Sequence, residues 1–126
     1  MKVLLTRPSE DAISTSNYLS SFSIESCIAP LLKIKKVRHK KIDAEKYDFF
    51  LFTSKNGVRH FNLKNKNFNG SKIIFAVGLE TKEALVNSGY KNLVNTNGNL
   101  DNLKMKIVKY LKPNYRILHP TYLSQN

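Results

Sequence analysis

Small, hydroxylated and basic residues follow the apolar runs of this chain, and they are the residues whose types could do chemistry. The pattern occurs at Leu5-Thr6-Arg7-Pro8, at Phe52-Thr53-Ser54-Lys55-Asn56 and at Val77-Gly78-Leu79-Glu80-Thr81. Each apolar run is typical of a buried strand, and the residues after it are typical of a turn into a helix. Because parallel α/β sheets bind ligands beyond the carboxyl ends of their strands, these turns are the candidate sites.

The turn after Phe52 is the best candidate. Ser54 can cap the helix that follows it, and the backbone amides of Lys55 and Asn56 can then donate to an anion. Taken alone, the same residues are more typical of a helix cap with no further role. The chemistry predicted here is therefore anion binding by peptide N–H groups.

The other two turns offer weaker versions of the same chemistry. Gly78 allows the backbone to turn sharply or to approach a ligand closely, and Thr81 lies in the first helical turn after it. Arg7 supplies a guanidinium that can hold a carboxylate through two hydrogen bonds, although a lone surface arginine is more often simply solvated. In both turns, taken alone, a plain structural role is the more common one.

Metal and nucleophile chemistry find little support in the sequence. The three histidines, His39, His60 and His119, are far apart and lack metal-ligand spacing. The single cysteine, Cys27, lies in an apolar run and is predicted to be a small buried strand residue rather than a nucleophile. No glycine-rich phosphate loop and no serine elbow motif is present.

The elements that must position these turns alternate along the chain. Strands are predicted over residues 2–6, 24–29, 48–53, 72–77, 90–94 and 116–119. Helices are predicted from Ser9 as N-cap, and over residues 55–63, 80–88 and 100–111. Residues 31–41 alternate between apolar and basic side chains, which predicts an extended, half-exposed connecting strand. The alternation of strands and helices predicts an α/β fold built on parallel sheets.

Composition limits the classes of partner. The chain has 126 residues, of which 41% are hydrophobic, and its net charge is +12. A positive field of this kind suits nucleic acid, an anionic membrane or an acidic small molecule, but biased genomic drift towards lysine is an equal alternative. No apolar run approaches the ~20 residues of a membrane span, and the first residues lack a secretory leader. A cytoplasmic protein is expected.

The order and spacing of the motifs resemble uroporphyrinogen-III synthase. The matching segments are Leu5-Thr6-Arg7-Pro8, Pro30, the run from Asp48 to Val58, Val77-Gly78-Leu79-Glu80-Thr81 with Ala84-Leu85 and Gly89, and Asn97-Gly98-Asn99-Leu100. Two places depart from the family pattern: Lys82 replaces a small residue, and Pro120-Thr121-Tyr122 replaces a turn that contains glycine.

The resemblance implies a specific reaction and architecture. The family cyclises linear hydroxymethylbilane to uroporphyrinogen III, with loss of water and inversion of the last pyrrole ring, and uses no metal or cofactor. Its fold has two α/β domains joined by a two-stranded connector, with the substrate between them. On that map residues 1–33 begin domain one, residues 34–42 form the connector and residues 43–126 form most of domain two. The rest of domain one and the return connector are absent, so this chain alone, expected to be a monomer, is expected to be inactive.

The resemblance also implies which residues bind the eight carboxylates of the substrate. They are Arg7, Thr53, Ser54, Lys55, Asn56, Gly78, Leu79 and Thr81. A different class of function stays open as the alternative, namely a small basic α/β module that binds nucleic acid. Strong salt dependence without any preference for tetrapyrroles would distinguish that module from a synthase.

Overall fold

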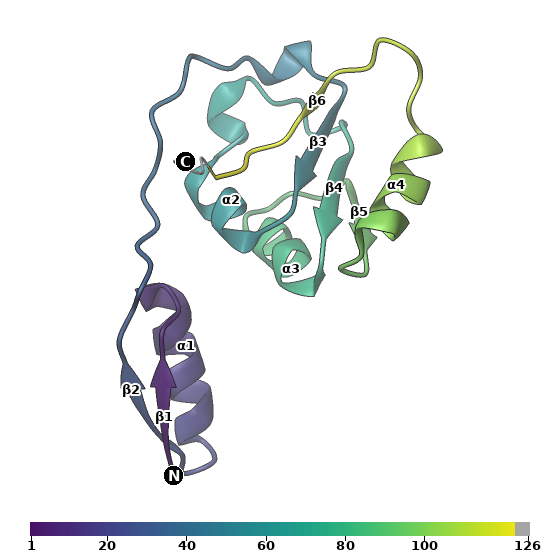
Figure 1. Cartoon of the computed structure of the whole chain (residues 1–126). Coiled ribbons are helices and arrows are strands. Elements are labelled where there is room, and N and C mark those ends of the chain that lie inside the picture. The colour runs from purple at the N-terminus through teal and green to yellow at the C-terminus, as the bar shows by residue number, and fades with distance from the viewer. Residues whose placement is uncertain (123–126) are drawn as a thin grey trace. The chain divides into compact units, whose positions relative to one another are not determined.

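The structure is a computed structural model that describes residues 1–122, apart from the side chain of Leu100. The chain divides into two compact units between Lys36 and Val37 (Figure 1). This division falls inside the predicted connector of residues 34–42, while the domain assignment itself stays a prediction. The end of the predicted second domain, residues 123–126, lies outside the described residues.

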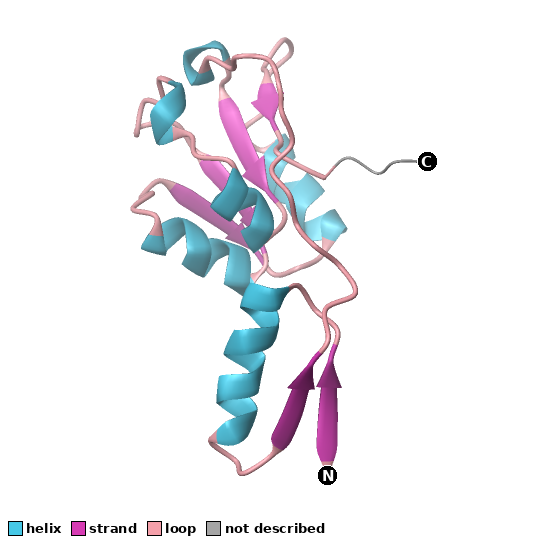
Figure 2. Ribbon diagram, turned by 90° about the vertical axis from the view of Figure 1, so that its left-hand side faces the viewer, coloured by secondary structure: helices cyan, strands magenta, loops and turns pink. Residues whose placement is uncertain are grey.

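The first unit is a parallel strand–helix–strand motif. Its elements are β1 (Lys2–Leu5), α1 (Ser9–Ser20) and β2 (Glu25–Ile28). The strands pair in parallel, with Leu4 opposite Cys27, and α1 runs alongside them (Figure 2). A hydrogen bond of 2.7 Å between the hydroxyls of Ser16 and Ser26 ties α1 to β2. The predicted βαβ unit is therefore confirmed.

Two expectations for this unit were wrong. The side chain of Leu4 is 63% exposed and Cys27 is exposed as well, because α1 covers only one face of the two-stranded sheet. Pro8, and not Ser9, occupies the N-cap position of α1, and no side chain caps this helix. Glu10 and Asp11 lie in its first turn, where negative charge is favoured by the helix dipole.

The segment after β2 is irregular. Residues 29–43 contain no strand or helix, and residues 31–41 are exposed. The predicted connecting strand at residues 31–41 is therefore wrong. The alternation of side chains is present, but no strand among residues 1–122 pairs with this segment, and a strand needs a partner for its backbone hydrogen bonds.

The second unit is built on a four-stranded parallel sheet. Its strands are β3 (Phe49–Phe52), β4 (Ile74–Val77), β5 (Leu93–Thr96) and β6 (Ile117–Leu118), in the order β5-β4-β3-β6. Its α-helices are α2 (Lys55–His60), α3 (Leu79–Asn87) and α4 (Leu100–Val108), with short 3₁₀ helices η1 (Ala44–Lys46) and η2 (Lys64–Lys66). All neighbouring strands are parallel, which confirms the predicted α/β class.

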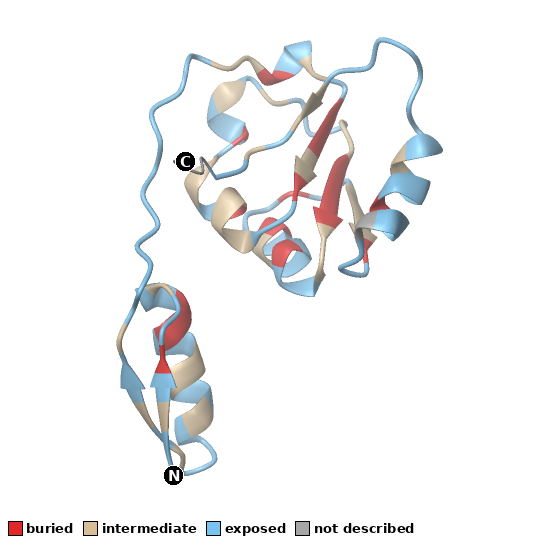
Figure 3. Ribbon diagram, in the orientation of Figure 1, coloured by how far each residue is buried: buried red, intermediate tan, exposed pale blue. Residues whose placement is uncertain are grey.

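Helices cover both faces of this sheet. On one face Phe50, Phe52 and Ile74 pack with residues of α2 and α3, including the fully buried Leu85. On the other face Phe49 and Phe75 pack with Leu103 of α4. Side chains of a strand alternate between its faces, so β3 and β4 supply both halves of the core (Figure 3). No helix among the described residues is long and apolar enough to cross a membrane.

Several element boundaries differ from the predicted ones. The helix α2 ends at His60 rather than at residue 63, α4 ends at Val108 rather than at residue 111, and β5 begins at Leu93 rather than at residue 90. Tyr90 lies in the core instead, where its hydroxyl accepts a 3.0 Å hydrogen bond from the backbone N–H of Leu63. Gly89 has φ +83° after the end of α3, which confirms the predicted left-handed cap.

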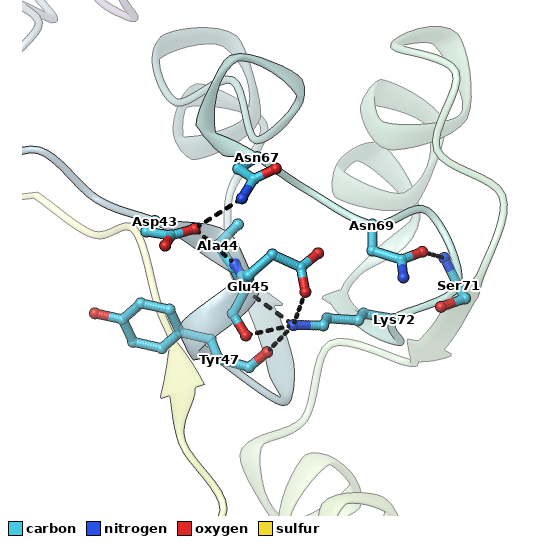
Figure 4. Close-up of polar contacts among 8 residues, drawn as sticks. All are labelled: Asp43, Ala44, Glu45, Tyr47, Asn67, Asn69, Ser71 and Lys72. Carbon is cyan, nitrogen blue, oxygen red and sulfur yellow. Dashed lines mark hydrogen bonds and ion pairs between the residues drawn. The ribbon is translucent and has the colours of Figure 1, made fainter.

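Lys72 anchors the amino ends of the two central strands. Its Nζ donates to the carbonyl oxygens of Ala44 at 3.3 Å, Glu45 at 2.8 Å and Tyr47 at 2.8 Å (Figure 4). The carboxylate of Glu45 lies 3.6 Å from the same nitrogen. One ammonium group thereby satisfies the carbonyls of η1 and of the residues that lead into β3, and it links them to the start of β4.

Candidate functional site

The strand order creates a switch point at β3. From β3 the chain moves to β4 on one side, whereas β6 pairs with β3 on its other side. The connecting helices consequently lie on opposite faces, with α2 and α3 on one face and α4 on the other (Figure 1). Open parallel sheets bind ligands outside the carboxyl ends of their strands at such a point. We call this part of the second unit the carboxyl edge.

Residues 53–56, the β3 turn, lie at the carboxyl edge. Ser54 is the N-cap of α2, and its hydroxyl oxygen accepts a 3.1 Å hydrogen bond from the N–H of Gly57, which confirms the predicted cap. The side-chain oxygen of Asn56 accepts a 3.3 Å bond from Arg59. These contacts leave the side chains engaged within α2, so the donors that the turn can offer an anion are its amides and the lysine.

Residues 78–81, the β4 turn, lie beside it. Gly78 has φ +84° and is the N-cap of α3, and no side chain caps this helix. The N–H of Gly78 itself donates to the carbonyl of Thr96 at 2.9 Å. The amides of Leu79, Glu80 and Thr81 are therefore the donors of an uncapped helix N-terminus, where an anion is favoured. Thr81 is only 3% exposed as a whole residue, whereas Leu79 and Glu80 are exposed, so the amides of Leu79 and Glu80 are the more accessible donors of this turn.

A charged contact joins the two turns. The ammonium of Lys55 lies 3.3 Å from a carboxylate oxygen of Glu80. The side chain of Lys55 is 20% exposed and that of Glu80 is 67% exposed. The two predicted turns thus lie side by side, because β3 and β4 are parallel neighbours. The carboxyl edge already holds one carboxylate, that of Glu80, against a lysine.

A third strand end brings His119 to the carboxyl edge. Nε2 of His119 lies 3.0 Å from the hydroxyl oxygen of Thr53, 66 residues away in the sequence. Partial burial of the ring lowers the pKa of His119 below its ordinary value, which favours the neutral imidazole. The next residue, Pro120, packs its carbonyl oxygen against Gly57, where an added Cβ would lie 3.3 Å from it.

Sequence reasoning gave His119 no role. The signal available was its place at the end of the predicted strand 116–119, which matches the places of Thr53 and Gly78 after their own strands. Arg7, the remaining predicted site residue, belongs to the first unit, where its guanidinium donates to the hydroxyl of Thr15 at 3.2 Å. The second unit alone therefore brings together the other predicted residues: Thr53, Ser54, Lys55, Asn56, Gly78, Leu79 and Thr81.

Comparison with known families agrees with this architecture. Residues 14–122 match the family model of uroporphyrinogen-III synthase HemD, a range that includes the whole carboxyl edge and begins after Arg7. No curated protein matches the chain significantly. Neither result supports the nucleic-acid alternative. With most of its length matched and its parallel α/β fold as expected, the chain belongs to the uroporphyrinogen-III synthase family.

Proposed function

We propose that the carboxyl edge of the second unit binds carboxylate side chains of a linear tetrapyrrole. The observation that carries this proposal is the side-by-side placement of the β3 and β4 turns, joined by the contact between Lys55 and Glu80. One ligand with several carboxylates can reach both turns at once. Family members cyclise such a ligand, hydroxymethylbilane, to uroporphyrinogen III.

The assigned roles follow from the donors at each turn. Amides of Leu79, Glu80 and Thr81 take one carboxylate, and Gly78 keeps the approach to them open, since a Cβ added there would meet nothing within 4 Å. Lys55 and the amides after Ser54 take another.

Thr53, Asn56 and Arg7 complete the proposed set of binding residues. The net charge of +12 adds attraction for an octacarboxylate. A cyclisation that needs the two ends of a chain to meet depends mainly on positioning, which such contacts supply. Location in the cytoplasm and a monomeric state remain predictions from the sequence.

Equilibrium titration with porphyrins tests the proposal. We expect saturable binding of uroporphyrin, which has eight carboxylates, and weaker binding of coproporphyrin, which has four. Binding should weaken as salt is raised because the contacts are ionic. Saturable binding of single-stranded DNA together with no binding of uroporphyrin would contradict the proposal.

Replacing Glu80 with glutamine is expected to strengthen uroporphyrin binding about threefold. The carboxylate of Glu80 contacts Lys55, which is a proposed substrate ligand, and its removal also reduces repulsion of an incoming anion. The ion pair is partly exposed, so the free energy of unfolding should hardly change. Fluorescence titration of both proteins measures the difference.

Glu83→Gln is the matched control, since it removes the same charge from the same helix one turn further from the carboxyl edge. Equal affinities for the two variants would show that only net charge matters. In that case Glu80 would not compete with the ligand for Lys55.

A further inference from the structure

The hydrogen bond between Thr53 and His119 lies where a ligand of this sheet is expected, and neither a helix cap nor the core requires it. Nε2 of His119 is 3.0 Å from Oγ1 of Thr53, and both residues are exposed. They meet because β6 pairs with β3 in parallel, with Leu118 opposite Phe50. The pair thus occupies the switch point between β3 and β6.

Threonine can support this imidazole in either charge state. A neutral ring accepts at Nε2 from the hydroxyl of Thr53, and a protonated ring donates from Nε2 to the same oxygen. Within residues 1–122 the other ring nitrogen, Nδ1, makes no hydrogen bond. In both states Nδ1 then carries a hydrogen that can be donated to a ligand.

We propose that His119, oriented by Thr53, binds a carboxylate of the tetrapyrrole at the switch point and takes up a proton from solvent as it does so. Protonated imidazole then donates from Nδ1 to the carboxylate and from Nε2 to Thr53. No covalent bond forms or breaks in this step. The inference rests on the proposed function and adds a pH-dependent ligand to it.

Partial burial explains why proton uptake should accompany binding. The charged side chains of the neighbouring elements are Lys55, Arg59 and His60 on α2 and Glu80 on α3, while Arg116 precedes β6 at the other end of that strand. Lys55 and Glu80 pair with one another, and partial burial disfavours imidazolium in the unliganded protein. A bound carboxylate reverses this balance because opposite charge raises the pKa of a histidine.

Isothermal titration calorimetry in buffers of different ionisation enthalpy measures this uptake. Uroporphyrin is titrated at about pH 7, where a histidine changes charge readily. The unaltered chain should take up protons on binding. H119Q should lose most of that uptake and bind about tenfold more weakly, as expected for one charge-assisted hydrogen bond.

Further variants separate positioning from general damage. T53V should reduce proton uptake while T53S keeps it, because only the hydroxyl orients the ring. H39Q is the matched control, because it removes one histidine elsewhere in the same unit. The ring of His39 packs against Phe61, just beyond the end of α2. Uptake and affinity should stay unchanged in this control.

The results of these titrations distinguish the role of His119 from the proposed function. Equal proton uptake and equal affinity in H119Q and the unaltered chain would overturn this inference and leave the proposed function standing. Failure of the unaltered chain to bind uroporphyrin would overturn both. Loss of uptake in H119Q, with binding retained at lower affinity, supports both.

Discussion

Replacing Gly78 with valine is expected to weaken uroporphyrin binding about a hundredfold, equivalent to the loss of roughly two charge-assisted hydrogen bonds. The added side chain would occupy open space at the N-cap of α3, where nothing of the protein lies within 4 Å of the new Cβ. An incoming carboxylate would meet the valine before it reached the first amides of α3. Titration of uroporphyrin into the variant measures the effect.

The same substitution also strains the backbone, and this effect must be separated from the first. Gly78 has φ +84°, a conformation in which a branched side chain costs about 1–3 kcal/mol. Gly98→Val is the matched control, because Gly98 has φ +67° and is equally open but follows β5, the outer strand. Both variants should lose similar stability. If both also bound uroporphyrin like the unaltered chain, the α3 amides would not be the binding donors.

Replacing Lys72 with methionine should lower the free energy of unfolding by about 2–4 kcal/mol. Methionine keeps an unbranched apolar stem but removes the donors to the carbonyls of Ala44, Glu45 and Tyr47. The side chain of Lys72 is 19% exposed, so water replaces the lost partners only in part. Urea unfolding followed by circular dichroism suits a chain without tryptophan.

Lys46→Met provides the comparison for this prediction. Lys46 belongs to the same η1 helix and is exposed, so its loss removes the same charge without leaving buried carbonyls unsatisfied. Its free energy of unfolding should change by about a few tenths of a kcal/mol at most. Identical midpoints for the two variants would contradict the anchoring role of Lys72.

The central strands could be predicted from sequence because their signals are local. Phe49 to Phe52 and Ile74 to Val77 are continuous apolar runs, as strands buried on both faces require. Ser54 and Gly89 also act locally, through a cap and a left-handed turn. The exposure of Cys27 could not be predicted in this way, because it depends on whether a second layer covers that face of the sheet.

The site was predictable to the same extent. The β3 and β4 turns follow directly from strand ends, and their adjacency follows from parallel pairing of consecutive strands. The contact of Thr53 with His119 depends instead on β6 pairing with β3 on the side away from β4. The order of strands in a sheet cannot be read from a local sequence pattern. The anchoring role of Lys72 could not be predicted for the same reason, since its partners lie 25 to 28 residues away in the sequence.

Titration of uroporphyrin into the ¹⁵N-labelled chain, followed by amide chemical shifts, tests the central claim most directly. We expect the largest shifts at the amides of residues 54–56 and 79–81, at the carboxyl edge. Other basic surfaces of the described residues include the pocket of about 270 Å³ lined by Lys64, Tyr90 and Lys91, and the exposed segment 33–41. Saturating shifts at either of those surfaces, with the amides of the carboxyl edge unchanged, would contradict tetrapyrrole binding at the carboxyl edge.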